Sequence, residues 1–389
     1  MIYNKQIIIN TIYNKHNLNM NTSITKSGRS FLFLATAGLL SLSACKKDKL
    51  PEIPPQSLST VGVYVLNEGT YSSTTGASAS SISYYDVVSQ KVEIDYFKKQ
   101  NNRALGDNAN DLKQYGSKIY CVVTGTTQSA KDSYLEVISE STGKSLKRIA
   151  FSDENGGFMP RNIVFDKNKA YISGYDGKIT RLDTASLTID SRLLVGGALE
   201  QLAIAKNKIY VTNSVHPSFP SPINSSVSVV DIATFTKLKE IPTALNPRAI
   251  SATTSGDLFV LTSGDFPTIP GTIDRLSSTS DTRLSTGSDL GLSFLSITGT
   301  TGFAIGYALF IKSFDANTGT LGNDLIKDAT VIKAPYAVTA DAFEKTFYVA
   351  DAKDYSSNGM MFCFGADGKA KFSFETGISP KLAVFKYGY

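Results

Sequence analysis

Histidine is scarce in this chain of 389 residues, which contains only two. His16 lies in a leader that we expect to be cleaved, so His216 alone remains for chemistry. A metal site that needs two or three imidazole ligands is therefore excluded. A Ser-His-Asp arrangement would depend on His216, and the G-x-S-x-G turn that presents such a serine is missing. We predict a protein that is not an enzyme and that uses no metal or cofactor.

Hydrophobic runs long enough to cross a bilayer are not found either. The apolar segment FLFLATAGLLSLSA, residues 31–44, is shorter than the roughly 20 residues that a membrane-spanning helix needs. Basic residues precede it and small residues end it, which is typical of a secretory signal peptide. We therefore interpret residues 1–44 as a signal peptide region, with translation starting at Met20. Leu42-Ser43-Ala44-Cys45 resembles the bacterial lipobox, in which the cysteine carries lipid; a plain signal peptide with an incidental Cys45 is the alternative.

The chain also lacks a real excess of positive charge. Its 39 basic and 34 acidic residues give a net charge of +5, but the leader holds four basic residues and no acidic one. After cleavage 35 basic and 34 acidic residues remain. Nucleic-acid binding requires a basic surface that displaces counterions from phosphates, so we predict no nucleic-acid partner.

A polar, proline-rich segment follows the leader. Residues 45–60 contain KKDKLPEIPPQSLST, a composition that favours an extended tether, so we predict a lipidated Cys45 and a flexible linker there. Residues 61–389 contain no further break of this kind and form one predicted domain. Cys121 and Cys363 lie in apolar strand-like runs, where unpaired cysteines behave as small hydrophobic residues.

A repeated pair of short strands dominates this domain. The second strand of the pair recurs seven times, as VYVLNEG, KIYCVVTG, KAYISGYDG, KIYVTNS, DLFVLTSG, GFAIGYA and KTFYVADA. A period of 40 to 50 residues with several short strands per repeat is typical of a β-propeller. The first copy has no opening strand, and ISPKLAVFKYGY at the C-terminus supplies one. The sequence therefore predicts an all-β fold, a seven-bladed β-propeller closed by pairing of its N- and C-terminal strands.

The connections differ between the two ends of such a ring. Turns such as DKNK, AKNK and ADGK are short and repetitive, as tight reversals require. The loops before first strands and between second and third strands are long, irregular and aromatic, and we call the end that carries them the loop face. Variable loops on a rigid scaffold commonly bind ligands. We predict ligand contacts from Asn67, Glu68, Tyr71, Asn110, Asp111, Arg161, His216, Phe219, Arg248, Phe266, Tyr336 and Tyr355.

A family resemblance rests on VYVLNEG, SISYYD, GDNANDLKQYGSKIYCVV and YLEVISESTGKSLKRI. These segments resemble Bacteroidota surface lipoproteins with YncE-like, YVTN-type propellers, over roughly Val61 to Tyr389. The best characterised branch is the BtuG-type cobalamin-binding proteins. The resemblance implies an outer-membrane location that faces the cell exterior, attachment through the lipid alone, and capture of a nutrient without chemistry. It further implies a corrinoid ligand and delivery to a TonB-dependent transporter.

Other interpretations stay open at this point. The propeller is alternatively a scaffold or protein-interaction module in another uptake complex, or an enzyme such as a lyase or lactonase, for which the sequence supplies no His/acid cluster. Asn67, Glu68, Asn110 and Asp111 also have a rival explanation. Short polar side chains at strand ends often bond neighbouring backbone groups, which is a structural role.

Overall fold

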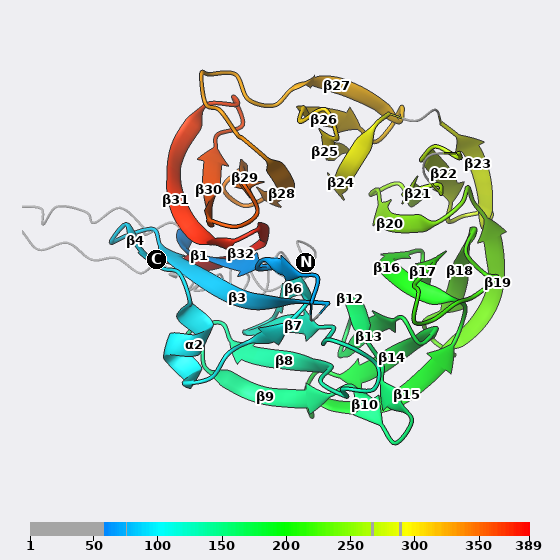
Figure 1. Ribbon diagram of the computed structural model, residues 1–389. Helices are drawn as coiled ribbons and strands as arrows, with labels where there is room; N and C mark the ends of the chain where they lie inside the picture. Colours follow the sequence, from blue (N-terminus) through cyan, green and yellow to red (C-terminus); the bar gives the residue numbers. More distant parts are fainter. Residues whose placement is uncertain (1–57, 75, 266–267, 288–289) are drawn as a thin grey trace, which may run out of the picture. The chain divides into compact units, whose positions relative to one another are not determined.

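A computed structural model describes residues 58–389 except residue 75, residues 266–267 and residues 288–289. Their strands form seven sheets of four or more strands, arranged in a ring (Figure 1). The predicted seven-bladed β-propeller is confirmed. The expected signal peptide, Cys45 and residues 46–57 of the expected linker lie outside the described residues.

Blade one is built from both ends of the domain. Its strands are, from the centre outward, β32 (Pro380–Gly388), β1 (Ser59–Asn67), β3 (Ala77–Asp86) and β4 (Lys91–Glu93). Two short strands also pair with β3, namely β2 (Tyr71–Ser72) and β5 (Gly106–Asp107). Helix α2 (Tyr96–Asn101) follows β4, with Asp95 as its N-cap, and the sequence had not indicated it.

The other six blades each use four consecutive strands. Blade two contains β6 (Ala109–Tyr115), β7 (Lys118–Val123), β8 (Tyr134–Ser139) and β9 (Ser145–Ala150). Blade three contains β12 (Pro160–Asp166), β13 (Lys169–Gly174), β14 (Lys178–Asp183) and β15 (Thr188–Leu194). Blade four contains β16 (Ala198–Ala205), β17 (Lys208–Ser214), β18 (Ser226–Asp231) and β19 (Thr236–Pro242).

Blade five contains β20 (Pro247–Ala252), β21 (Asp257–Thr262), β22 (Ile273–Ser277) and β23 (Thr282–Thr286). Blade six contains β24 (Leu292–Thr298), β25 (Thr301–Gly306), β26 (Ile311–Asp315) and β27 (Thr320–Asp324). Blade seven contains β28 (Pro335–Asp341), β29 (Thr346–Asp351), β30 (Asn358–Phe364) and β31 (Ala370–Ile378). A two-stranded hairpin, β10 (Ser152–Asp153) and β11 (Gly156–Gly157), adjoins blade two in the sequence.

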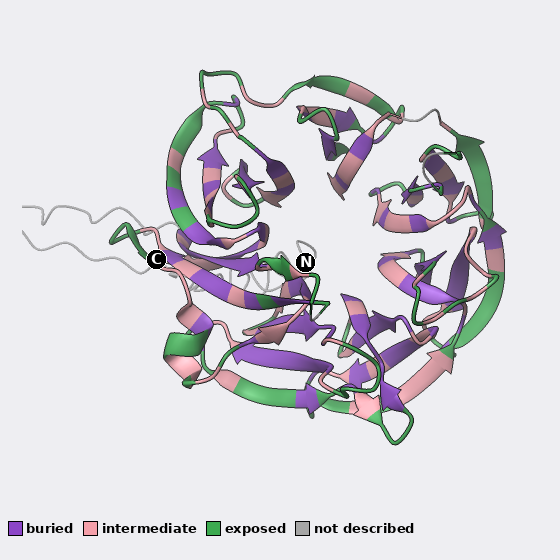
Figure 2. Ribbon diagram, viewed as in Figure 1, coloured by how far each residue is buried: buried purple, intermediate pink, exposed green. Residues whose placement is uncertain are grey.

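The core lies between neighbouring blades. The second strands are buried along nearly their whole length, as in β7 and β29, because each is covered by a blade on both faces. The outermost strands are largely exposed, and every residue of β23 is exposed (Figure 2). The seven apolar runs seen in the sequence are the seven second strands. Cys121 and Cys363 are buried and unpaired.

Closure of the ring is a strand pairing between the two ends of the domain. β32 runs antiparallel to β1, with Val63 opposite Phe385 and Val65 opposite Ala383. β32 thereby takes the innermost place in blade one, as the sequence predicted. Among the described residues no helix has the length and apolar character needed to span a membrane.

Candidate functional site

A β-bulge interrupts the innermost strand of every blade, always near the same end. In β20, for example, Pro247 lies opposite Thr262 and Ala249 opposite Leu261, which leaves Arg248 as the extra residue. A bulge bends its strand and re-aims a side chain. The first residues of the seven bulges form what we call the bulge ring: Lys381, Asn110, Arg161, Glu200, Arg248, Ser293 and Tyr336.

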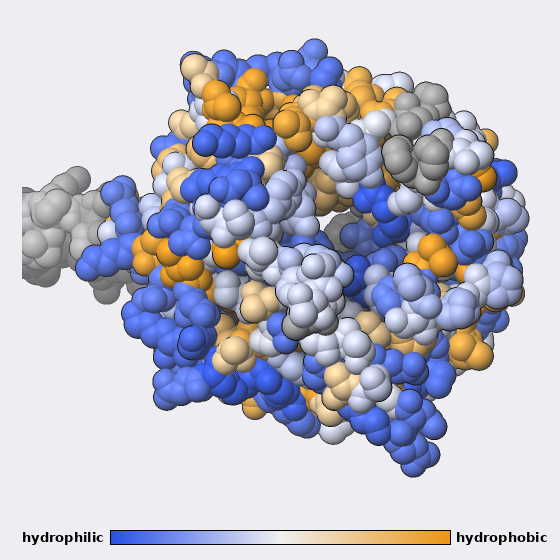
Figure 3. Space-filling view, in the orientation of Figure 1, coloured by the Kyte–Doolittle hydropathy of each residue, from blue (hydrophilic) through white to orange (hydrophobic). Residues whose placement is uncertain are grey.

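The bulge ring lies at the loop face. Each bulge adjoins the residue that ends the second strand of its blade, such as Asn67 in β1 and Asp351 in β29, and the long loops start there. Figure 3 shows an opening at the middle of this face, bordered largely by hydrophilic side chains. The arrangement places seven side chains, one per blade, around the inner edge of the ring.

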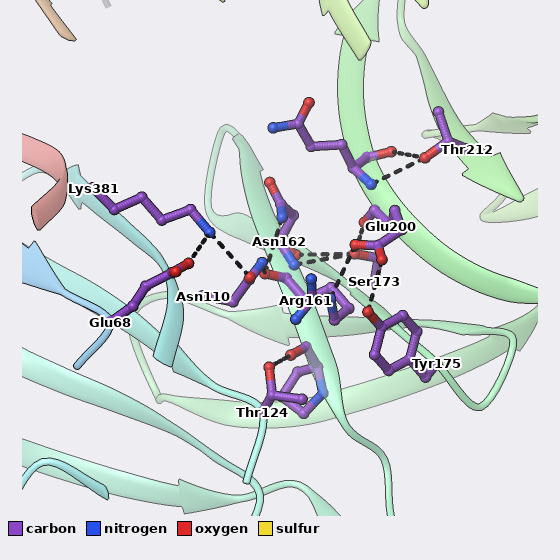
Figure 4. A network of polar contacts seen from close by, with 12 residues as sticks. Glu68, Asn110, Thr124, Arg161, Asn162, Ser173, Tyr175, Glu200, Thr212 and Lys381 are labelled. Atoms are coloured by element: carbon purple, nitrogen blue, oxygen red, sulfur yellow. Dashed lines mark hydrogen bonds and ion pairs between the residues drawn. The ribbon is translucent and has the colours of Figure 1, made fainter. Parts of the chain in front are cut away.

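A chain of polar contacts joins part of the bulge ring to Glu68, the residue that follows β1. The Tyr336 hydroxyl donates to Glu68 Oε2. Lys381 Nζ lies 2.7 Å from Glu68 Oε1 and 3.2 Å from Asn110 Oδ1 (Figure 4). Asn110 Nδ2 in turn donates to the carbonyl oxygen of Arg161 at 2.6 Å. These bonds connect blades seven, one, two and three.

The contacts continue into blade four through an ion pair. Arg161 Nε lies 3.0 Å from Glu200 Oε2, and the Tyr175 hydroxyl donates to Glu200 Oε1 at 2.7 Å (Figure 4). The Arg161 guanidinium also lies over the Tyr175 ring, 4.7 Å from its centroid. We call the connected set Tyr336, Glu68, Lys381, Asn110, Arg161, Glu200 and Tyr175 the polar belt.

Electrostatics fix the charge states in the polar belt. Burial raises the pKa of Glu68, but the Lys381 ammonium and the hydrogen bonds from Lys381 and Tyr336 outweigh it and hold that pKa below its usual value. Burial, together with the Glu68 carboxylate, raises the pKa of Tyr336. Burial opposes the charge on Arg161, but Glu200 beside it raises the pKa of the guanidinium overall. The belt therefore holds two carboxylates and two cations, each charge with a partner.

His216 belongs to an aromatic stack beside the belt. Its ring lies 4.2 Å from the Tyr175 ring, and Phe219 packs 5.8 Å from His216. His216 Nδ1 accepts a hydrogen bond from the Ser218 backbone N–H at 3.2 Å. Burial, aided by the Arg161 charge, lowers the pKa of His216. The imidazole thus braces its own loop and is disfavoured as a cation.

Asn67 and Asp111, both predicted to bind ligand, have well-defined partners inside the protein. Asn67 is 0% exposed and donates to the hydroxyls of Ser81 and Ser83. Asp111 is also buried and accepts from the backbone N–H of Ile163, at 3.0 Å, in the next blade. These contacts hold strands and blades together, as the structural role that the sequence had left open for both residues requires.

The same polar contacts recur elsewhere in the ring. Asn213 in blade four donates to Ser226 and Ser228, as Asn67 does to its serines. Gln201 accepts from the Ile250 N–H at 2.8 Å, as Asp111 does from the next blade. These contacts are therefore part of the frame and are not confined to one site.

The remaining predicted residues are more scattered. Tyr71 is exposed, and Tyr355 packs its ring edge against Tyr336, with centroids 5.9 Å apart. Arg248 belongs to the bulge ring, and its hydrogen bonds go to the backbone of blade six, at Leu292 and Ser293. Phe266 lies outside the described residues. The structure joins seven of the predicted residues through hydrogen bonds or ring contacts: Glu68, Asn110, Arg161, Tyr336, Tyr355, His216 and Phe219.

Three central residues were missed at the sequence level. Lys381 directly follows Pro380, just as Arg161, Arg248 and Tyr336 each follow a proline. Its position after a proline that opens a strand could therefore have pointed to it. Glu200 has no preceding proline. Tyr175 lies in the shortest loop between a second and a third strand, and loop length had been the guide to function.

The connections at the loop face carry seven of the fifteen large apolar side chains that are exposed among the described residues: Tyr71, Val215, Ile269, Tyr307, Leu309, Val331 and Tyr355. Surface apolar groups concentrated on one face commonly mark a binding surface. No group of three or more His, Cys, Asp or Glu side chains suited to a metal ion occurs in the described part of the chain.

Comparisons with solved structures agree with the fold. A quinonprotein alcohol dehydrogenase-like protein from Bacteroides thetaiotaomicron is similar, with a TM-score of 0.62, 13% identity, and coverage of 84% of this chain and 78% of that one. The dihydro-heme d1 dehydrogenase NirN has a TM-score of 0.53 at 12% identity, covering 86% and 77%. Hydrazine synthase from Kuenenia stuttgartiensis has a TM-score of 0.50 at 14% identity, covering 65% and 74%. At such low identity these likenesses show the propeller fold alone.

Sequence comparison points to a family. No curated protein matches the sequence. The family model described as domain of unknown function (DUF5074) matches residues 61–276, which is more than half of the chain. The chain therefore belongs to the DUF5074 family.

Proposed function

We propose that this protein is a non-catalytic binding protein that captures a small nutrient at the loop face, and that the nutrient is a corrinoid. The observation that carries the proposal is the bulge ring with the exposed aromatic residues around it. It places charged, amide and hydroxyl groups at the inner edge of the ring, with Tyr71 and Tyr355 exposed beside them.

The chemistry of a corrinoid suits such a face. A corrin is a broad, partly apolar ring that carries many amide groups at its edge. Exposed aromatic rings supply area for stacking, and Asn, Arg, Lys and Glu side chains supply donors and acceptors for the amides.

The proposal includes a lipid anchor at Cys45, an outer-membrane location and delivery of the ligand to a TonB-dependent transporter. These parts rest on the lipobox-like Leu42-Ser43-Ala44-Cys45 and on the family resemblance. Labelled palmitate should enter the wild-type protein in a bacterial host with lipoprotein processing. Equal labelling of Cys45→Ala would contradict the anchor.

Isothermal titration with cyanocobalamin tests ligand capture. We expect binding at micromolar protein, and Tyr71→Ala and Tyr355→Ala should each weaken it about 3- to 10-fold, because an aromatic contact contributes about 0.5–1.5 kcal/mol beyond its buried area. Phe343→Ala is the matched control, since Phe343 is equally exposed but lies in the turn between β28 and β29 at the opposite end of the ring. The absence of heat with the wild type would overturn the corrinoid assignment.

A further inference from the structure

Arg248 differs from the other two cations of the bulge ring. Lys381 and Arg161 each pair with a carboxylate, Glu68 and Glu200 respectively. Within the described part of the chain Arg248 forms no ion pair. The bulge ring and Glu68 together therefore hold three cations and two carboxylates, and the uncompensated positive charge is that of Arg248.

The guanidinium of Arg248 is held in place but not satisfied. Nη1 donates to the carbonyl oxygen of Ser293 and Nη2 to that of Leu292, both at 2.9 Å. Nε is buried and has no acceptor. Burial lowers the pKa of Arg248, and Tyr307 and Glu200 only partly offset this effect. A buried charge without a counter-ion is costly, and a specific unsatisfied donor calls for an explanation.

A cavity of about 630 Å³ lies between the loop-face ends of blades five and six. Arg248 is not one of its lining residues and adjoins it through Leu292. Leu292, whose carbonyl oxygen accepts from Arg248, is part of its lining. The lining is mainly apolar, with Leu261, Ile269, Ile273, Leu290 and the ring of Tyr307. Cavities of roughly 300–1,000 Å³ with an apolar wall and a few polar groups are typical small-molecule sites.

We propose that this cavity binds a small amphiphilic anion, whose apolar body fills the space between blades five and six and whose carboxylate, sulfonate or phosphate pairs with Arg248. The anion supplies the missing counter-charge, and a guanidinium forms strong charge-assisted hydrogen bonds with such oxyanions. Arg248 also belongs to the bulge ring on which the corrinoid proposal rests, but the anion site is argued from the unpaired guanidinium and the cavity and is tested without a corrinoid.

A pair of fluorescent probes that differ only in charge tests the inference. The anionic probe is 8-anilinonaphthalene-1-sulfonate, and the neutral probe is N-phenyl-1-naphthylamine, which has the same rings without the sulfonate. We expect the wild type to bind one equivalent of the anionic probe about tenfold or more tightly than the neutral one, because a hydrogen-bonded charge contact contributes more than the apolar wall alone. Equal affinities would overturn the proposal.

Substitutions locate the binding. Arg248→Gln should remove the preference for the sulfonate while leaving binding of the neutral probe unchanged, and that retained binding also shows that the cavity is intact. A preference that survives Arg248→Gln contradicts the proposal.

The wall of the cavity offers a variant with little risk to folding. Tyr307 is 70% exposed and lines the cavity, so Tyr307→Ala should weaken both probes about 3- to 10-fold. Leu309 is 55% exposed in the same turn but does not line the cavity, so Leu309→Ala is the matched control and should change neither affinity. Equal effects of the two variants would show that the probes bind elsewhere.

Discussion

At the scale of single residues, Glu68 is the junction of the polar belt. Glu68 accepts hydrogen bonds from Lys381 in blade one and from Tyr336 in blade seven. Its pKa is held below the usual value of 4.5. A carboxylate with a lowered pKa in the folded state stabilises the fold above its unfolded pKa. That contribution is lost as the pH falls through the folded-state pKa.

Because the pKa of Glu68 is lowered in the folded state, the effect of Glu68→Gln on stability should depend on pH. At pH 7 the variant should lose about 1 kcal/mol of unfolding free energy relative to the wild type, since the pair with Lys381 is only partly buried. As the pH falls through the folded-state pKa of Glu68, which lies below 4.5, the difference should shrink towards zero, because the wild-type carboxylate becomes protonated as well. Urea denaturation of the wild type and the variant, at pH 7 and at acid pH, measures this difference in unfolding free energy. The exposed Glu154→Gln should change stability at neither pH, and a Glu68→Gln deficit that stays constant down to pH 2 would contradict the assigned charge state.

The same residues show how far a sequence can locate a site. Arg161, Arg248 and Tyr336 were accessible because each follows a proline that opens a repeat. Tyr175 could not be located in this way, because it contacts Arg161 and His216, which lie in other strands and loops. Contacts between residues distant in the sequence depend on blade order and strand register, which composition does not reveal.

At the scale of elements, neighbouring innermost strands are tied together at their bulges. Asp111 in β6 accepts from the Ile163 N–H in β12, and Gln201 in β16 accepts from the Ile250 N–H in β20. Each bulge leaves backbone groups without a ladder partner, and these side chains satisfy them. The sequence predicted the second strands from their apolar runs, but a bulge shows only once two strands are paired.

Asp111→Ala should therefore act on stability and not on binding. Losing the acceptor leaves the buried N–H of Ile163 unsatisfied, which typically costs about 1–3 kcal/mol. Thermal denaturation should show a lower melting temperature, while titration with cyanocobalamin should give an unchanged affinity. Lys113→Ala is the control, because the Lys113 ammonium lies 3.5 Å from Asp111 and its side chain is 41% exposed, so its loss should cost less stability than loss of the Asp111 carboxylate. An unchanged melting temperature with a lost affinity would return Asp111 to the binding site.

At the scale of the whole molecule, stability depends on a pairing between segments more than 300 residues apart in the sequence. β32 covers one edge of β1 and packs against blade seven, where the Ala383 N–H donates to Thr339. Closure of this kind removes the free sheet edge that an open array of blades would expose. The C-terminal ISPKLAVFKYGY was recognisable as an opening strand with no second strand after it, which is why ring closure could be predicted from the sequence alone.

Removing residues 380–389 should open the ring. The truncated chain exposes the edge of β1 and the apolar side chains of two blades, so we expect aggregation or loss of cooperative unfolding in size-exclusion chromatography and circular dichroism. Removing Tyr389 alone should have little effect, since that residue is exposed and follows the strand. A monomeric truncated chain with wild-type unfolding would show that closure by β32 is dispensable.

The bulge ring also bears on how a family with this fold can diversify. Its seven positions are geometrically equivalent, yet in this chain they hold lysine, asparagine, arginine, glutamate, arginine, serine and tyrosine in blade order. The residues that build the blades lie elsewhere, in the apolar second strands. Substitutions at these seven positions can therefore change the polar surface of the loop face one blade at a time, while the hydrophobic layers between the blades stay the same.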